Sequence, residues 1–194
     1  MSRIYNINNH LMEYKSNCMD SKGATPLPTG IVIGNYTWAT TNLEYDDGGE
    51  GITIIDNVTS NGVNMGTQYY YTWEAAVRIA SKIPGWHLPS LEEFNSLVSY
   101  CGGSTVAGGK LKSTTGWKNN GNGTNDYDFN GLPVGLYDKR LNALVSVGFY
   151  GLWRTSNESN NDSSTIFALV NYQNTSTITS YSKGDKISVR LVKD

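Results

Sequence analysis

The sequence predicts a compact α+β domain over residues 31–194, preceded by an N-terminal arm and linker over residues 1–30. Two segments carry apolar residues at helical spacing, and several short β-branched runs lie between Gly-, Asn- and Pro-containing turns. Aromatic residues make up 11% of the chain, which argues against intrinsic disorder. A chain of 194 residues can also bury one substantial core.

Strands are expected wherever β-branched and aromatic residues gather between turn residues. The first two surround the Gly34-Asn35 turn, and the third follows a loop rich in Asp and Gly. In the final strand, alternate apolar residues are expected to share one face. The expected strands are residues 31–33, 36–43, 52–55, 149–154, 166–172 and 187–193.

The first expected helix begins after Thr72, whose hydroxyl can cap it. Its apolar residues recur at i, i+3, i+4 and i+7, which predicts one buried stripe. The members of that stripe are Trp73, Ala76, Val77 and Ala80.

The second expected helix begins with a capping box formed by Ser90 and Glu93 and ends at Gly102-Gly103. Its predicted buried stripe is Phe94, Leu97, Val98 and Cys101. A cysteine on such a stripe is expected to be a core thiol. For Cys18 and Cys101, a single disulfide and two unpaired thiols are the alternatives, and we favour unpaired thiols.

Residues 102–131 are rich in Gly and Asn and predict a long loop. Within it, Asp126, Asp128 and Asn130 stand at the first, third and fifth positions of an EF-hand loop. The twelfth position is Tyr137, which cannot supply a carboxylate. We therefore favour turns in which these side chains bond to the backbone, with a metal site as the weaker alternative. No cofactor is expected.

The low net charge of the sequence and its lack of catalytic motifs argue against several classes of function. The net charge of −2 gives no basic footprint for nucleic acid, and no apolar run could cross a bilayer. The N-terminus shows no signal-peptide h-region. The two histidines, His10 and His87, lie apart, and no nucleophile elbow or phosphate-binding loop occurs. We expect no enzymatic activity, no nucleic-acid partner and no membrane insertion.

The stretch from residue 153 to residue 183 has the strongest compositional bias, since 20 of its 31 residues are Asn, Ser, Thr, Tyr or Asp. One alternative is the solvated face of a β domain. The other is a binding surface, where aromatic rings supply contact area and polar side chains supply hydrogen bonds. The candidate ligand-binding residues are Trp153, Arg154, Ser156, Asn157, Glu158, Asn160, Asn161, Asp162, Asn171, Tyr172, Gln173, Asn174 and Tyr181.

Six motifs in order resemble the Fibrobacter succinogenes major paralogous domain. The resemblance runs from about Ile31 to the C-terminus and implies a C-type lectin-like fold, with two helices packed on short antiparallel strands and long loops. The motifs are GNYTWATTNL (34–43), YTWEAA (71–76), GWHLPS (85–90), AGGKLK (107–112), GNGTNDYDF (121–129) and SVRLV (188–192).

The resemblance also bears on activity. Formylglycine-generating enzymes, which are distantly similar, use cysteines in their site, and here the matched region contains Cys101 alone. The sugar-binding motifs of calcium-dependent lectins do not occur, and Trp153 is followed by Arg154-Thr155. The fold is similar, too, to that of variable proteins of diversity-generating retroelements. In those proteins, mutation of adenines in the gene varies positions near the C-terminus and favours codons for Asn, Ser, Thr, Tyr and Asp. These are the residue types that are enriched in residues 153–183.

We therefore expect a non-enzymatic ligand-binding or adhesion module for a protein or glycan ligand on a cell surface. A phage receptor-binding or surface-display protein fits this expectation, and the favoured locations are the cell surface, the secreted fraction or a phage virion. The alternatives are a relative of the formylglycine-generating enzymes and a structural module of a surface or virion assembly. In both the structural and the binding hypothesis, the arm over residues 1–30 is a candidate for oligomerisation.

Overall fold

The structure, a computed structural model, describes residues 27–194. Over this part of the chain, twelve strands form five small antiparallel sheets, and the three helices contain 8, 10 and 5 residues. The architecture is therefore mostly β, and the prediction of a compact two-helix α+β domain of the C-type lectin-like kind is wrong. Most of the predicted arm, together with His10 and Cys18, lies outside the described residues.

The first sheet joins the two ends of the described chain. It contains β1 (Gly30–Ile33), β2 (Tyr36–Ala39) and β12 (Val192–Lys193), in the order β1-β2-β12. The last segment forms only a short strand, because Ile187 and Ser188 make isolated bridges to other segments instead of a continuous ladder. Both faces of that segment are buried, including the side chains of Ser188 and Arg190.

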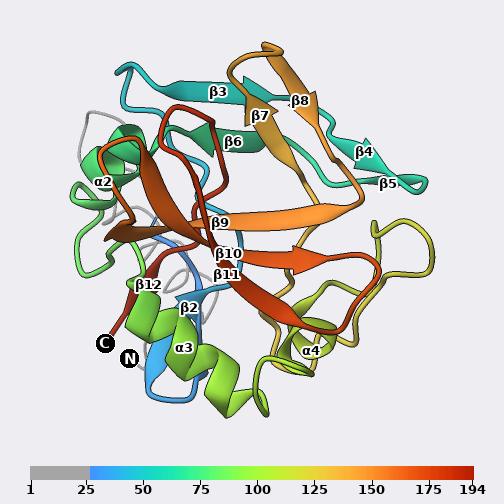
Figure 1. Ribbon diagram of the computed structural model, residues 1–194. Helices are drawn as coiled ribbons and strands as arrows, with labels where there is room; N and C mark the ends of the chain where they lie inside the picture. The colour runs from blue at the N-terminus through green and yellow to red at the C-terminus, as the bar shows by residue number, and fades with distance from the viewer. Residues whose placement is uncertain (1–26) are drawn as a thin grey trace, which may run out of the picture.

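The second sheet consists of the three longest strands and has the order β11-β10-β9. These strands are β9 (Tyr150–Glu158), β10 (Ser163–Val170) and β11 (Ser176–Ser182), and Figure 1 shows them side by side in orange to red. A strand rises about 3.3 Å per residue, so β10 separates its two flanking turns by about 25 Å. The sequence did not predict β11, because its residues are mostly polar and exposed.

Three two-stranded sheets complete the β structure. β3 (Ile52–Ile55) pairs with β6 (Gln68–Tyr71), and β4 (Thr59–Ser60) pairs with β5 (Val63–Asn64). The third pair is β7 (Leu136–Asp138) with β8 (Ala143–Val145). Of these six strands only β3 was expected, because the others are short and lack a clear alternation of apolar and polar residues.

The two predicted helices are present. In α2 (Trp73–Ala80), the Thr72 hydroxyl accepts a hydrogen bond from the backbone N–H of Ala75 at 3.2 Å. The buried face differs from the expected stripe, since Val77 is exposed. The residues that α2 buries are Ala75, Ala76, Ile79 and Ala80.

The helix α3 (Leu91–Tyr100) has the predicted capping box, in which Ser90 and Glu93 bond to each other's backbone N–H groups. Phe94 and Leu97 are buried as expected, and Cys101 caps the helix end from inside the core. A third helix, α4 (Ala107–Leu111), lies where the sequence predicted a loop. No helix in residues 27–194 is both long enough and apolar enough to span a bilayer.

Candidate ligand-binding site

The predicted binding surface divides between two ends of the β9–β11 sheet. Residues 156–162 and Tyr181 lie at the β9–β10 turn, whereas residues 171–174 form the β10–β11 turn. Because the two turns are at opposite ends of β10, about 25 Å apart, the candidate residues cannot contact a single small ligand together. The structure therefore offers two separate places to examine.

Trp153 and Arg154 belong to neither end, because both side chains are completely buried. Arg154 donates to Ser164 Oγ at 2.7 Å and to the backbone oxygens of Ser182 at 2.8 Å and Asp185 at 2.6 Å. Burial lowers the pKa of the Arg154 guanidinium to about 10. This corrects the expectation that the two residues anchor a ligand, since they hold the interior of the sheet together.

At the β9–β10 turn, the polar side chains bond mainly to the protein itself. Asn157 Oδ1 accepts from the backbone N–H of Leu91 at 2.7 Å, at the start of α3. Glu158 pairs with Lys183 at 2.5 Å. The side chain of Asn160 accepts from the backbone N–H of Asp162 at 2.9 Å, as in an Asx turn. The abundance of polar residues at the β9–β10 turn is thus explained by the hydrogen bonds that stabilise the turn and the start of α3.

Tyr181 is half-buried beside these residues and packs against the small apolar cluster that includes Leu152 and Ile166. Burial raises the pKa of its phenol. Ser156 and Asn161 are exposed nearby, and the backbone oxygen of Asn161 accepts from Lys183 Nζ at 3.1 Å. Tyr181 therefore contributes packing as well as a polar surface.

The β10–β11 turn has a different character. Tyr172, Gln173 and Asn174 are all exposed, and Tyr172 keeps 68% of its surface open to solvent. The neighbouring Asn171 is buried and donates through Nδ2 to the backbone oxygen of Lys118 at 3.3 Å. These residues border a cavity of about 220 Å³, which we call the Tyr172 cavity. Its lining is Lys112, residues 119–122 and residues 171–174.

The opposite wall of the Tyr172 cavity comes from residues that the sequence did not single out. Asn119 and Asn120 are exposed and have positive φ angles of 55° and 58°. The backbone N–H of Gly121 donates to the oxygen of Lys118 at 3.0 Å, which closes a tight turn around them. Two central residues with positive φ are typical of a type I′ turn, in which Asn, Asp and Gly dominate the central positions, as the Asn119-Asn120 pair does here. That signal could have predicted the wall.

Glycines allow the two walls to meet. A Cβ on Gly121 would overlap the backbone of Asn171, and a Cβ on Gly108 would overlap the backbone oxygen of Thr175. The backbone N–H of Gly109 donates to the oxygen of Asn174 at 3.1 Å. Accordingly, α4 lies beside the end of the sheet where β10 and β11 connect (Figure 1). The glycine motifs of residues 107–112 and 121–129 thus hold the β10–β11 turn at close range.

Lys112 stabilises the β10–β11 turn through hydrogen bonds to its backbone. Its side chain is almost completely buried, and Nζ donates to the backbone oxygens of Val170 at 3.2 Å and Gln173 at 2.9 Å. The ammonium also lies 5.3 Å from the centre of the Trp117 ring. No carboxylate within residues 27–194 pairs with it, and burial lowers its pKa. Lys112 is therefore a structural cation that fixes the position of residues 171–174.

The other chemical candidates take structural roles in the described part of the chain. Asn125 Nδ2 donates to Asp128 at 3.4 Å, and Asn125 Oδ1 accepts from the backbone N–H of Asn130 at 2.7 Å. The side chain that bonds to the backbone here is therefore that of Asn125, whereas Asp128 bonds to another side chain. Within residues 27–194, no group of three or more His, Cys, Asp or Glu side chains could hold a metal ion.

His87 and Cys101 were the remaining residues with catalytic side chains. His87 Nε2 lies 2.6 Å from Glu93 Oε1, next to the capping box of α3. Cys101 is an unpaired, fully buried thiol, and burial raises its pKa to about 11. A thiol of this kind is a poor nucleophile, because the reactive form is the thiolate. Cys18, with which a disulfide was the less favoured alternative, lies outside the described residues.

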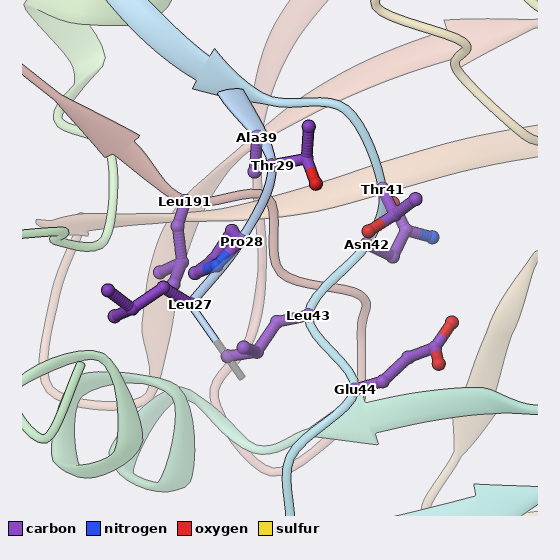
Figure 2. A pocket seen from close by; sticks show the side chains of 9 residues that line it. All are labelled: Leu27, Pro28, Thr29, Ala39, Thr41, Asn42, Leu43, Glu44 and Leu191. Atoms are coloured by element: carbon purple, nitrogen blue, oxygen red, sulfur yellow. The ribbon is translucent and has the colours of Figure 1, made fainter. Parts of the chain in front are cut away.

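A second pocket of about 220 Å³ lies beside the start of β1. Figure 2 shows the aliphatic side chains of Leu27, Leu43 and Leu191 gathered on one side, and the polar Asn42 and Glu44 on the other. None of the residues that the sequence predicted as ligand-binding lines this pocket. For that reason we place the candidate site at the Tyr172 cavity.

Comparison with known proteins gives one match. The family model of the Fibrobacter succinogenes major domain matches residues 31–193, which agrees with the boundaries that the six motifs indicated. No curated protein and no solved structure matches the chain.

Proposed function

The chain belongs to the Fibrobacter succinogenes major domain family. From the geometry of the candidate site we propose that it is a non-enzymatic ligand-binding module. Its ligand is a protein or glycan on a cell surface. Its binding surface is the end of the sheet formed by the β10–β11 turn, the turn at residues 118–121 and α4. This proposal narrows the surface expected from residues 153–183 to one of its two ends.

One observation carries the proposal. Tyr172, Gln173 and Asn174 are exposed on one side of the Tyr172 cavity, and Asn119 and Asn120 are exposed on the other. A rigid aromatic ring with amides around a cavity is the composition that binding proteins use for contact area and adaptable hydrogen bonds. Lys112 and the glycines hold the backbone that carries these side chains in place before a ligand arrives, which reduces the entropy lost on binding.

The burial of Cys101 supports a non-enzymatic role over the formylglycine-generating alternative. That chemistry needs an accessible thiolate, and Cys101 is enclosed by the apolar cluster that includes Phe94 and Leu97. The third hypothesis, a structural module attached through the arm, concerns residues that lie mostly outside the described part. Deleting residues 1–30 and measuring the oligomeric state tests it separately.

A combined glycan and protein array tests the proposed function. We expect the wild-type protein to bind at least one ligand class and Tyr172→Ala to lose most of that signal. Leu141→Ala is the matched control, because Leu141 is equally exposed (66% against 68%) but lies between β7 and β8. If Tyr172→Ala binds as the wild type does, the binding surface is not at the β10–β11 turn.

Diversification by a retroelement is part of the proposal and is supported by the residue bias of residues 153–183. If the region is diversified, substitutions among isolates should concentrate at exposed positions such as Tyr172 and Asn174 and spare the buried Trp153. Sequencing the gene from many isolates measures this. Uniform codons together with the lack of an adenine-rich template repeat nearby would contradict it.

A further inference from the structure

A further cavity lies beside the Tyr172 cavity, next to α4. It measures about 350 Å³, and we call it the Lys110 cavity. Its lining includes Lys110, Thr124 and Asp126 together with the aliphatic side chain of Val106. Asn122 and Asn174 line both cavities, so the two cavities adjoin at these asparagines, and we call the pair the hollow.

The junction presents amide groups that the protein leaves available. Asn122 Oδ1 accepts from the backbone N–H of Trp117 at 3.1 Å, which orients the side chain. Its Nδ2 has no hydrogen-bond partner among residues 27–194, and the same holds for the whole Asn174 amide. Asn174 is held by its backbone and packs its side chain against Gly109. Two positioned amides thus mark the place where a ligand would pass from one cavity to the other.

The composition of the walls indicates the chemistry of that ligand. An amide side chain both donates and accepts hydrogen bonds, which matches a sugar hydroxyl that does the same. The exposed Tyr172 ring offers a flat face to the C–H groups of a sugar ring. The lining of the Tyr172 cavity includes no aliphatic Leu, Ile or Val side chain. Peptides, in contrast, are usually anchored by apolar side chains in fitted pockets.

We propose that the hollow binds an oligosaccharide of at least two sugar units, one unit in each cavity, with the linkage between Asn122 and Asn174. The inference rests on the proposed function and adds the ligand class and its minimum length. The Tyr172 cavity measures about 220 Å³, below the roughly 300 Å³ at which ordinary small-molecule sites begin, so a ligand larger than one sugar unit has to extend into the adjoining cavity. The Lys110 cavity then holds the next unit, near Lys110 and Asp126.

The test uses a glycan array that carries the mono-, di- and trisaccharides of each sugar in one linkage, followed by calorimetry on the best series. We expect the disaccharide to bind at least about 10-fold more tightly than its monosaccharide, because the second unit adds contacts in the Lys110 cavity. Tyr172→Ala should weaken every member of the series. Asp126→Ala should weaken the disaccharide and leave the monosaccharide unchanged, and circular dichroism checks that both variants remain folded.

The outcomes separate this inference from the proposed function. Equal affinities for mono- and disaccharide, with no effect of Asp126→Ala, would overturn the two-unit site and leave a binding module intact. Binding of array proteins but of no glycan, with loss in Tyr172→Ala, would overturn the saccharide class alone. Failure to bind either array would overturn both.

Discussion

The indole N–H of Trp153 donates to Oδ1 of Asn42 at 2.9 Å, across 111 positions of the chain. The same oxygen accepts from Arg190 Nη2 at 2.9 Å, and Asn42 Nδ2 donates to Gln68 at 3.2 Å. Arg190 is completely buried and bonds to oxygens of Asn42 and the backbone, with no carboxylate partner in the described part of the chain. Burial lowers its pKa to about 9. One buried amide therefore connects the start of the domain, the central sheet and the C-terminal segment.

Removing that amide should strongly destabilise the fold. Asn42→Ala deprives both the Trp153 N–H and the Arg190 guanidinium of an acceptor, and each unsatisfied buried donor costs about 1–3 kcal/mol. We expect the free energy of unfolding in urea to fall by about 3 kcal/mol. Thr177→Ala on the exposed face of β11 serves as the control and should change it by less than about 0.5 kcal/mol. A loss of under about 1 kcal/mol in Asn42→Ala would mean that the network does not hold the core.

A second prediction follows from the close contact between Gly121 and the backbone of Asn171. In Gly121→Ala, the new Cβ overlaps rigid backbone of Asn171, so the turn at residues 118–121 must move away from the β10–β11 turn. Overpacking of this kind costs about 1–3 kcal/mol, and the displaced wall should also weaken ligand binding. In Gly184→Ala the Cβ meets only the flexible end of Lys139. Thermal unfolding should therefore separate the two variants, and equal melting temperatures would contradict the close contact.

Cys101 should be unreactive in the native protein. A Cys18→Ser background leaves Cys101 as the single thiol, and its burial and raised pKa both oppose reaction with Ellman's reagent. We expect labelling at pH 8 to occur only after guanidinium is added. Rapid labelling of the folded protein would reopen the formylglycine-generating alternative.

Acid should destabilise the protein partly through Asp47. Its carboxylate lies 2.9 Å from Arg78 Nε and 2.6 Å from Lys82 Nζ, and these hydrogen bonds hold its pKa far below the usual range. Near pH 4 the unfolded chain begins to take up a proton at Asp47 that the folded state does not, so this contribution to stability is lost as pH falls.

The variant Asp47→Asn isolates that contribution. It should be less stable than the wild type at pH 7, and the difference should shrink as urea unfolding is repeated from about pH 5 down to about pH 2. Asp126→Asn, which removes an exposed carboxylate with no salt bridge in residues 27–194, is the control. A difference for Asp47→Asn that does not depend on pH would show that the ion pair is not the cause.

Local signals in the sequence predicted local structure well. The capping box of Ser90 and Glu93 and the hydroxyl of Thr72 define helix starts within a few residues, so both helices begin where expected. The strand β3 was also found from its β-branched run. The fold class was wrong because polar strands such as β11 are stabilised by pairing with a neighbour, here β10, which no local pattern reveals.

The candidate site was predicted in part for the same reason. Tyr172, Gln173 and Asn174 stood out by composition, but Asn119, Asn120 and Lys112 join them through contacts more than 45 positions apart. Composition alone also could not show that Trp153 and Arg154 are buried while their neighbours are exposed. Tryptophan and arginine occur both in buried cores and in ligand-binding surfaces, and only the folded structure distinguishes the two cases.

The most direct test of the binding site is a backbone amide NMR titration of ¹⁵N-labelled protein with the oligosaccharide that the array selects. We expect chemical-shift changes concentrated in residues 119–126 and 171–175, at the end of the sheet beside α4. Changes concentrated in residues 156–162 and around Tyr181, at the opposite end of β10, would contradict this expectation.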